Sequence, residues 1–299
     1  MPVNLVYIIS AYRLPEQLVR LVTRLRTENA TVLVHIDKKA PSEIFGAISE
    51  GVRSLPDVHL LRRHVCHWGG FGHVAASLEG IAAIVENGIP CDHAVLLTGQ
   101  DFPLKSNEEI NTRLGGYREH SFLSHFPVPN NDEWLPDGGL DRIDRWYFWV
   151  RGRRLQVPST HRQGRLGSAF TLISRVVPRR RFLPGLRPYG GSSYWCLSGD
   201  AVSLVHRYVR DHPEFVSFFR HVSVPDELFF QTILVNSELR NRIVNDDLRF
   251  MRWTATGPGP EVLLVDDFDS LRDTECLFAR KFDQDVDGRI LDLIEEHLL

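Results

Sequence analysis

Short apolar runs of strand length alternate with segments of helix length through the first third of the chain. This alternation constrains the fold more than any other feature. The continuous runs LVYIIS, VLVHI and HAVLLT are typical of strands that are buried on both faces. Strands are predicted at 5–10, 32–36, 58–65 and 93–98, and helices at 15–25, 42–52 and 72–88. The pattern predicts an α/β fold with a mainly parallel, doubly wound sheet, whose ligands bind outside the carboxyl ends of the strands.

The remainder of the chain adds further elements to this unit. Ser106 and Glu109 form an S-x-x-E capping box, which predicts that a helix begins directly after LTGQDFPLKS. Residues 121–190 are rich in Pro, Gly and Arg, so we expect loops that cross the sheet. A strand is predicted at 192–197, and helices at 199–211, at 225–237 and from 288 onward. We predict one domain over 1–299, with 1–115 as its nucleotide-binding part and 116–299 as its acceptor-binding and catalytic part.

The composition excludes several classes of protein. The chain has 299 residues, of which 24% are charged and 43% hydrophobic, and this is ordinary globular composition. A net charge of −3 argues against a protein that coats nucleic acid, so no nucleic-acid partner is expected. No apolar run is long enough to span a bilayer, and the N-terminus has no signal-peptide pattern. The four cysteines include no CxxC pair, so we expect a soluble protein of a reducing cytoplasm.

One segment has a distinct charge pattern. Between Arg145 and Arg187 there are eleven arginines and no Asp or Glu, interleaved with aromatic residues from Trp146 to Phe170. Cations mixed with aromatic rings favour a surface that binds phosphate, an anionic acceptor or an anionic membrane face. A solvated basic loop is the alternative interpretation.

Three segments contain residue types that bind metals, and each has a competing interpretation. HVCHWGGFGH (64–73) has histidines and a cysteine, but its glycines favour a packed turn. DQDVDG (283–288) begins like a calcium loop, but its closing acids come late and helix capping explains its aspartates. DDFD (266–269) follows an apolar segment, so Asp267 and Asp269 are a second candidate for Mn²⁺ or Mg²⁺. A loop with acidic caps is the alternative there, and we expect no resident metal ion.

An acidic residue lies at a predicted helix start. The segment SVPDELFFQTILVNS places Pro225 at the start and Glu227 in the first turn, where free N–H groups favour an ionised carboxylate. A general base must be ionised, so Glu227 is a candidate base, while a simple first-turn acid is the alternative. No P-loop, GxGxxG or GxSxG motif is present to indicate an ATPase, a dinucleotide site or a serine hydrolase.

Taken together, several segments resemble the core-2/I-branching β-1,6-N-acetylglucosaminyltransferase and peptide O-xylosyltransferase family, glycosyltransferase family 14. The resemblance runs nearly end to end and in order. LTGQDFPLKS and PDELFFQT are its specific motifs, and HWGG is a weak one. The matching segments are YIISAYRLPEQLVRLV, VLVHIDKKA, HWGG, LTGQDFPLKS, GGSSYWCLSGDAV, VPDELFFQTILVNS and LFARKFD.

The resemblance implies a GT-A-like fold, with a mainly parallel, Rossmann-like sheet flanked by helices. It also implies inverting transfer from a UDP-sugar without a metal cofactor. Departing UDP then needs cationic side chains, because negative charge develops on the diphosphate. Lys281 matches the family's lysine in this role. Arg249 and Arg252 are candidates for its arginine partner, and Arg280 is a further one, although neighbouring residues of a regular element point apart.

Other site residues are implied by the same resemblance. Glu227 matches the base that deprotonates the acceptor hydroxyl. Asp37 matches the acid near the uridine, and Trp68 and Asp101 are expected to line the donor pocket. The residues expected on the acceptor side are Asp144, Arg145, Trp146, Ser193, Tyr194 and Trp195.

The sequence leaves the donor sugar and the acceptor open. Xylose and N-acetylglucosamine are the donor sugars that the resemblance implies, and the acceptor is expected to be a glycan, a glycolipid or a peptide. The membrane anchor, stem and paired cysteines of animal relatives are lacking. We therefore expect a bacterial cytoplasmic enzyme of glycan synthesis, peripheral at the inner membrane face. The alternatives are a metal-dependent transferase that uses Asp267 and Asp269, and a non-catalytic glycan- or nucleotide-binding protein.

Overall fold

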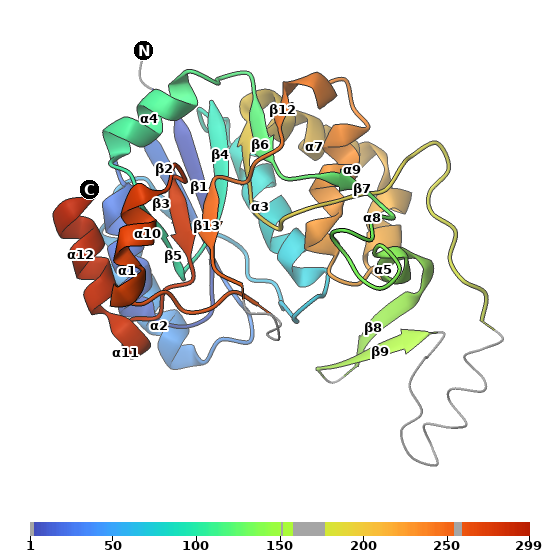
Figure 1. The fold of residues 1–299 in the computed structure, drawn as a ribbon, viewed down its shortest axis with the longest axis horizontal. Coiled ribbons are helices and arrows are strands. Elements are labelled where there is room, and N and C mark those ends of the chain that lie inside the picture. Colours follow the sequence, from blue (N-terminus) through green and yellow to red (C-terminus); the bar gives the residue numbers. More distant parts are fainter. Residues whose placement is uncertain (1–2, 151, 158–176, 254–258) are drawn as a thin grey trace.

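A seven-stranded sheet forms the centre of the protein (Figure 1). The computed structural model describes residues 3–150, 152–157, 177–253 and 259–299. The strand order is β12-β6-β11-β4-β1-β2-β3. These strands are β1 (Leu5–Ala11), β2 (Ala30–Ile36), β3 (Val58–Leu60), β4 (His93–Thr98), β6 (Ser121–Leu123), β11 (Trp195–Ser198) and β12 (Ile243–Val244).

The direction of the strands confirms the predicted fold class. β3, β2, β1 and β4 run parallel to one another, and β12 runs parallel to β6. Only β11 among these strands runs antiparallel, between β4 and β6. The protein therefore has the mainly parallel sheet flanked by helices that a GT-A-like fold requires.

Helices cover both faces of the sheet because its central strands are apolar on both faces. In β1, Leu5, Tyr7 and Ile9 pack into one buried cluster, whereas Val6 and Ile8 pack into another. The first cluster receives α1 (Pro15–Leu25), α2 (Ser42–Arg53), α4 (Asn107–Gly115), α10 (Phe268–Asp273) and α12 (Arg289–His297). The second receives α3 (Gly72–Glu86), α7 (Gly199–Asp211), α8 (Pro213–Phe219) and α9 (Phe229–Val235). Figure 1 shows these two groups on opposite sides of the sheet.

Three smaller sheets and several short helices complete the described chain. The sheet of β5 (Asp101–Pro103), β14 (Phe278–Arg280) and β13 (Arg249–Met251) joins segments that are far apart in sequence. The others pair β7 (Phe126–Pro127) with β10 (Tyr189–Gly190), and β8 (Trp146–Val150) with β9 (Arg153–Val157). The remaining helices are α5 (Leu140–Asp144), η1 (Pro225–Glu227), η2 (Arg240–Arg242), η3 (Val265–Asp267) and α11 (Gln284–Asp287). Within the described ranges, no helix has the length and apolarity needed to cross a membrane.

Most of the predicted elements are confirmed, but several differ in extent. The strand predicted at 192–197 is β11, which begins only at Trp195, and the stretch 121–190, predicted as loops, also contains β6 of the central sheet and the β8–β9 hairpin. The capping box is present, with Ser106 Oγ accepting from the Glu109 N–H at 3.2 Å. The predicted strand over 58–65 ends at Leu60, because the following residues turn across the end of β2. The predicted helix over 225–237 is divided into η1 and α9 at Leu228, whose ψ and φ are not helical.

The turn after β3 is fixed by a buried histidine. His35 Nε2 accepts a hydrogen bond from the backbone N–H of His64 at 2.9 Å, and its Nδ1 lies 3.0 Å from Ser10 Oγ. Burial lowers the pKa of His35 to about 4, and the neighbouring His64 acts in the same direction. The ring is therefore neutral near pH 7, and it holds the backbone of residues 64–66 against β2.

We expect the protein to lose stability as the pH falls from about 6.5 to about 4. The unfolded chain protonates His35 over this range and the folded chain does not, so the free energy of unfolding falls by about 1.4 kcal/mol per pH unit. Urea unfolding at a series of pH values measures the slope. A His35→Gln variant should show a shallower slope, and an unchanged slope would contradict this assignment.

Candidate functional site

The candidate site lies where the parallel strands end. Ala11 at the end of β1 pairs with Ile36 of β2, and Ser10 pairs with Thr98 of β4. The residues that follow β2 and β4 therefore meet at one edge of the sheet, the edge at which ligands of such folds bind. Asp37 and Asp101 follow these two strands, so the structure brings these two predicted residues to the same edge.

Asp37 is buried and held by backbone groups. Its Oδ1 accepts from the N–H of Lys39 at 2.9 Å and from the N–H of Cys66 at 3.3 Å. Its Oδ2 lies 3.6 Å from Lys39 Nζ. These contacts fix the carboxylate at the end of β2. The bond from Cys66 forms because His35 holds the turn that contains Cys66 next to Asp37.

Trp68 lies in the HWGG turn, two residues after Cys66, whose N–H bonds to Asp37. It is 64% exposed, and the guanidinium of Arg154 lies 5.7 Å from the centre of its ring. Gly69 has a positive φ of 66°, which a side chain rarely adopts, and its carbonyl accepts from the Val224 N–H at 2.9 Å. The turn that carries Trp68 is thus bonded directly to the segment that precedes η1.

Two buried arginines surround Asp101 in the small sheet. Register places Arg280 of β14 opposite Asp101 of β5, and Arg280 Nε lies 3.9 Å from Asp101 Oδ1. Arg249 is on the neighbouring strand β13. The guanidiniums of Arg280 and Arg249 lie 4.5 Å and 5.5 Å from the centre of the Tyr194 ring. Burial lowers the pKa of both arginines, and Asp101 opposes this effect for both.

This arginine pair retains unused hydrogen-bond donors. Arg280 Nε and Nη1 and Arg249 Nε are buried and donate to no group within the described part of the protein. Asp101 Oδ1 likewise accepts no hydrogen bond there. Buried polar groups nearly always have a hydrogen-bond partner, so unpaired donors on two cations favour the binding of an anion. The cluster is therefore able to bind a phosphate or diphosphate.

A turn over residues 191–194 connects this cluster to the PDE motif. Tyr194 contacts the arginine pair, and Ser193 Oγ donates to Asp226 Oδ2 at 2.9 Å. The Gly191 N–H donates to the carbonyl of Glu227 at 2.9 Å. A Cβ at Gly191 would lie 1.8 Å from the carbonyl oxygen of Ser124, so only glycine allows this close approach.

Glu227 is paired with a cation that the sequence did not indicate. Its Oε2 lies 2.5 Å from Nη1 of Arg142, whose guanidinium also lies 3.7 Å from the centre of the Trp134 ring. Burial raises the pKa of Glu227, Arg142 lowers it, and Asp226 raises it again. A carboxylate that is partly desolvated and held by one oxygen has the properties of a general base.

Two of the predicted cations occupy different surroundings. The Arg252 guanidinium donates to both Glu261 and Asp267, so its charge is already neutralised. Lys281 follows the end of β14, and its ammonium makes no hydrogen bond or ion pair with the residues that the structure describes. The arrangement therefore leaves Lys281, and not Arg252, with an unpaired charge beside Arg280.

Trp195 does not lie where the sequence interpretation expected it. The side chain is fully buried in the core and packs against Phe230, with 5.3 Å between the ring centres. Because side chains alternate along β11, Trp195 faces the core helices. Its expected role in lining the acceptor side is therefore corrected to a core position.

The other predicted acceptor residues lie beside α5 and β8. Asp144 accepts from Arg179 at 2.7 Å and lies 3.6 Å from Arg145 Nε. Trp146 has the guanidinium of Arg180 at 4.6 Å from its ring centre. Asp144, Arg145 and Trp146 thus lie where α5 ends and β8 begins. Residues 151 and 158–176 of the basic segment, including Phe170, lie outside the described residues.

The candidate metal ligands are engaged in other contacts. Asp267 is buried and accepts from Arg252, while Asp269 pairs with Arg272 at 2.7 Å. In DQDVDG, Asp283 caps α11 and the Asp287 carboxylate accepts from the Arg289 N–H, as the capping interpretation predicts. In the part of the chain that the structure describes, no three His, Cys, Asp or Glu side chains gather as metal ligands.

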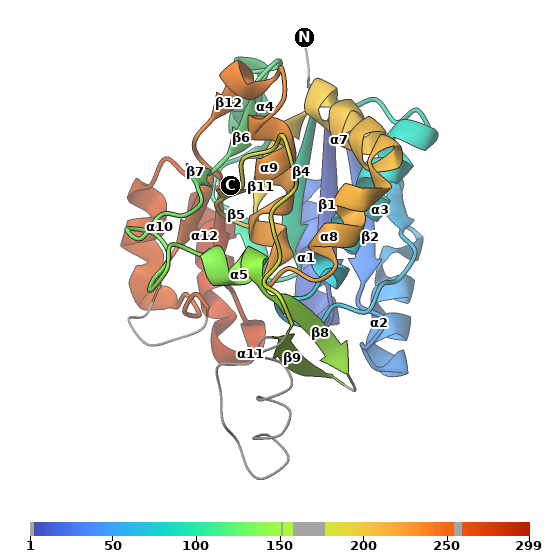
Figure 2. The same ribbon diagram turned by 90° about the vertical axis from the view of Figure 1, so that its right-hand side faces the viewer.

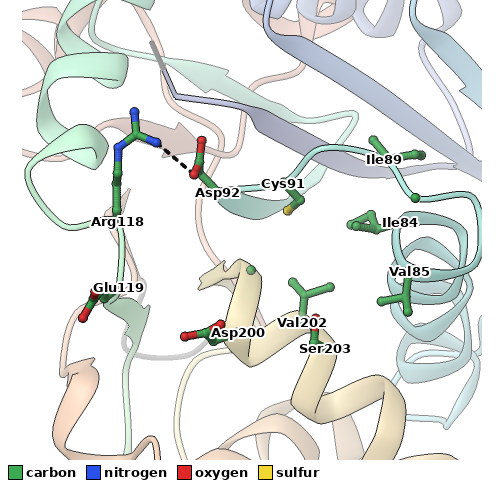
Figure 3. A pocket seen from close by; sticks show the side chains of 12 residues that line it. Ile84, Val85, Ile89, Cys91, Asp92, Arg118, Glu119, Asp200, Val202 and Ser203 are labelled. Carbon is green, nitrogen blue, oxygen red and sulfur yellow. Dashed lines mark ion pairs between the residues drawn. The ribbon is translucent and has the colours of Figure 1, made fainter. Parts of the chain in front are cut away.

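A pocket of about 530 Å³ lies at the opposite end of the sheet (Figure 3). It is lined by Cys91 and Asp92, which precede β4, and by Gly199 and Asp200, which begin α7. Asp92 is paired there with Arg118 at 2.9 Å. This pocket contains none of the predicted site residues, so it is separate from the candidate site.

The site residues that the sequence interpretation missed are Arg142, Arg154 and Asp226. Asp226 stands next to Glu227 in PDE, and this adjacency was a usable signal. Arg142 and Arg154 lie 85 and 69 residues from their partners Glu227 and Ser223, and no pattern in the sequence joins residues at such separations.

Comparison with known proteins gives a consistent family match. The family model described as Core-2/I-Branching enzyme matches residues 5–269. The chain is 25% identical over 323 residues to Xylosyltransferase 2 of Canis lupus familiaris, covering 99% of this chain and 34% of the relative. It is 24% identical over 318 residues to Xylosyltransferase 1 of Homo sapiens, covering 99% and 30%. The chain thus spans about a third of the length of these curated relatives.

A solved structure gives a weaker match. It is the mannosyltransferase Ktr4p from S. cerevisiae in complex with GDP, at 9% identity and a TM-score of 0.33. The match covers 81% of this chain and 67% of that chain.

We expect Gly191→Ala to destabilise the protein by about 1–3 kcal/mol, because the new methyl group collides with the Ser124 carbonyl. Gly46→Ala is the matched control. A Cβ at Gly46 meets nothing within 4 Å, and alanine favours the helix by about 0.5–1 kcal/mol. Chemical denaturation measures the free energy of unfolding of both variants. Equal effects would mean that the 191–194 turn tolerates a side chain at Gly191.

Proposed function

The chain belongs to the Core-2/I-branching enzyme family, and on this premise we propose that it is a glycosyltransferase that inverts the configuration of the transferred sugar. The donor is a UDP-sugar and the acceptor is a hydroxyl group. The observation that carries the proposal is the connection between Glu227 and the Arg249–Arg280 pair through one turn, residues 191–194. That turn holds a base and an anion site at a fixed separation, as displacement at a sugar carbon requires.

Glu227 acts as the base in this mechanism. Its carboxylate accepts the proton of the acceptor hydroxyl while the hydroxyl oxygen bonds to the anomeric carbon from the face opposite UDP. The bond between that carbon and the β-phosphate oxygen breaks, and UDP carries away the electron pair. Arg142 holds Oε2, so Oε1 is the oxygen that takes the proton.

The cations stabilise the diphosphate as it departs. Among the described residues, Arg280 and Arg249 offer unpaired, buried N–H donors, and Lys281, next to Arg280 in sequence, offers an unpaired ammonium. Donors fixed in a buried site stabilise the developing charge more than donors in water, because they need no reorganisation. These residues supply positive charge without a metal ion, so we propose that transfer is metal-independent. Arg252 is the weaker candidate because two acids already neutralise it.

The edge of the sheet next to these cations binds the nucleoside. Asp37 has a carboxylate fixed at the end of β2, and Trp68, in the turn that follows Cys66, offers an exposed indole ring. A carboxylate accepts hydrogen bonds from a uracil N–H or a ribose hydroxyl, and an aromatic ring stacks on a base. On the acceptor side, Ser193 and Tyr194 lie beside the PDE motif.

The donor sugar is proposed from the relatives. Both reported relatives are named xylosyltransferases, so we propose xylose first and N-acetylglucosamine, which the family resemblance also implies, second. The acceptor is a glycan, a glycolipid or a peptide hydroxyl, in bacterial glycan synthesis. All four cysteines are unpaired, which supports a reducing compartment such as the cytoplasm.

We expect Glu227→Gln to abolish transfer and to leave UDP affinity nearly unchanged, because an amide cannot accept the proton but occupies the same volume. Asp226→Asn is the matched control, since the neighbouring carboxylate is held by the Ser193 hydroxyl and should retain part of the activity. Transfer assays and UDP titrations measure the two effects. If Glu227→Gln retains most of its turnover, the assignment of the base is wrong.

Arg280→Met should weaken UDP binding by about ten-fold to one hundred-fold, which is the usual effect of removing a hydrogen bond to a charged group. Arg252→Met should retain UDP affinity, because Glu261 and Asp267 already occupy its guanidinium. Calorimetric titration of UDP compares the two variants, and equal losses of affinity would contradict the choice of Arg280.

Donor turnover should persist when EDTA is added, since the proposed cations are side chains. UDP release from UDP-xylose and UDP-N-acetylglucosamine, each with EDTA and again with Mn²⁺, measures this. Turnover only with Mn²⁺ would contradict the metal-free mechanism. Asp267 and Asp269 would then become the candidate ligands of a metal ion that binds the diphosphate.

A further inference from the structure

The β8–β9 hairpin has two chemically different faces. Side chains alternate along a strand, so residues that pair directly across the hairpin share a face. Tyr147, Trp149, Arg154 and Gln156 share the inner face, and Trp146, Phe148, Val150, Arg153, Leu155 and Val157 share the outer face.

The inner face packs onto the candidate site. Arg154 donates to Ser223 Oγ at 3.0 Å, and its guanidinium lies 5.4 Å from the centre of the Tyr147 ring. Tyr147 is buried, and its N–H donates to the carbonyl of His221 at 3.0 Å. A Cβ placed on Gly70 would lie 3.2 Å from the Trp149 ring, so the hairpin packs directly on the HWGG turn. These contacts fix the hairpin relative to the PDE motif.

The outer face carries exposed apolar side chains toward its tip. Phe148 is 38% exposed, Leu155 39% and Val150 51%. His221 covers only the base of this face, where it contacts the rings of Trp146 and Phe148. Figures 1 and 2 show the hairpin at the lower end of the molecule, projecting from the body. Exposed large apolar side chains that gather on one face of a projecting hairpin indicate an interaction surface.

The positive charge of the hairpin favours an anionic partner. The segment 146–157 contains three arginines and no Asp or Glu. Arg154 is on the inner face and Arg151 lies outside the described residues, so Arg153 is the arginine of the described outer face. Arg153 is exposed at the tip opposite Val150, and it makes no ion pair with any described residue. Apolar side chains with arginines at their edge are the combination that binds anionic lipid, because the chains enter the acyl boundary while the cations meet the headgroups.

We propose that the outer face of the β8–β9 hairpin docks the protein on an anionic lipid surface. A second copy of the chain is a poorer occupant, since a two-fold contact would bring the arginines of both copies together. A sugar chain is also poorer, because the side chains of Val150 and Leu155 offer no hydrogen bonds. Since the inner face is bonded beside the PDE motif, docking would hold the candidate site close to the membrane surface. The proposal does not depend on the proposed function, because lipid binding needs no turnover.

The test is cosedimentation of the full chain with vesicles of phosphatidylglycerol and phosphatidylcholine, compared with pure phosphatidylcholine. Wild-type protein should sediment with the anionic vesicles at low salt and less at high salt. Val150→Ser combined with Leu155→Ser should weaken binding by at least about ten-fold. Arg153→Glu should weaken it by at least about five-fold, the effect of about 1 kcal/mol per charge.

Two matched controls lie on α11 and α12, away from the hairpin (Figure 1). Val286→Ser changes an apolar residue that is 62% exposed, and Arg289→Glu changes an exposed arginine. Both should bind vesicles as the wild type does. Circular dichroism and UDP titration show whether each variant is folded.

Three results would overturn the proposal. One is wild-type protein that does not sediment with anionic vesicles at low salt. Another is vesicle binding that the hairpin variants and the control variants reduce equally. The third is binding that soluble heparin displaces while the Val150/Leu155 variant binds as well as the wild type, because a polyanion site would then explain the affinity.

Discussion

Two buried guanidiniums around one carboxylate are the constraint on which the rest of the site depends. Arg249 and Arg280 come from β13 and β14, and Asp101 comes from β5, so the charges meet only when this small sheet forms. Burial of a cation without a partner is costly, and Asp101 offsets part of that cost for both arginines. The remaining N–H donors have no acceptor among the described residues, so the cluster can offer them to an anion without rearrangement.

The 191–194 turn links this arginine cluster to the PDE motif, which the proposed reaction requires. Tyr194 lies against the arginines, while Gly191 and Ser193 are bonded to Glu227 and Asp226. A rigid link matters because displacement at a sugar carbon depends on the angle between the attacking oxygen and the leaving phosphate. Burial raises the pKa of Glu227, and the charge of Arg142, which contacts its carboxylate, opposes part of this effect.

The order of strands and helices was predictable because each signal is local. The apolar run of β1, the S-x-x-E box before α4 and the proline that begins η1 each act within a few residues. The errors in the predicted elements arose where contacts between residues far apart in sequence override the local sequence pattern. Residues 61–65 leave β3 because His35 draws the His64 backbone toward β2. Trp195 occurs in a motif beside acceptor residues, yet the pleat of β11 turns it into the core.

The sequence by itself determined the α/β class, the position of Glu227 behind Pro225 and the placement of Asp37 and Asp101 after their strands, because periodicity and capping are properties of neighbouring residues. Only the tertiary structure decided which cation has N–H donors that are not hydrogen-bonded to described residues. Arg252, Arg280 and Lys281 carry the same charge, but two acids occupy Arg252, and Arg280 faces Asp101 with unpaired donors. That difference comes from pairings between chain segments that fold together from far apart, and no short pattern encodes such pairings.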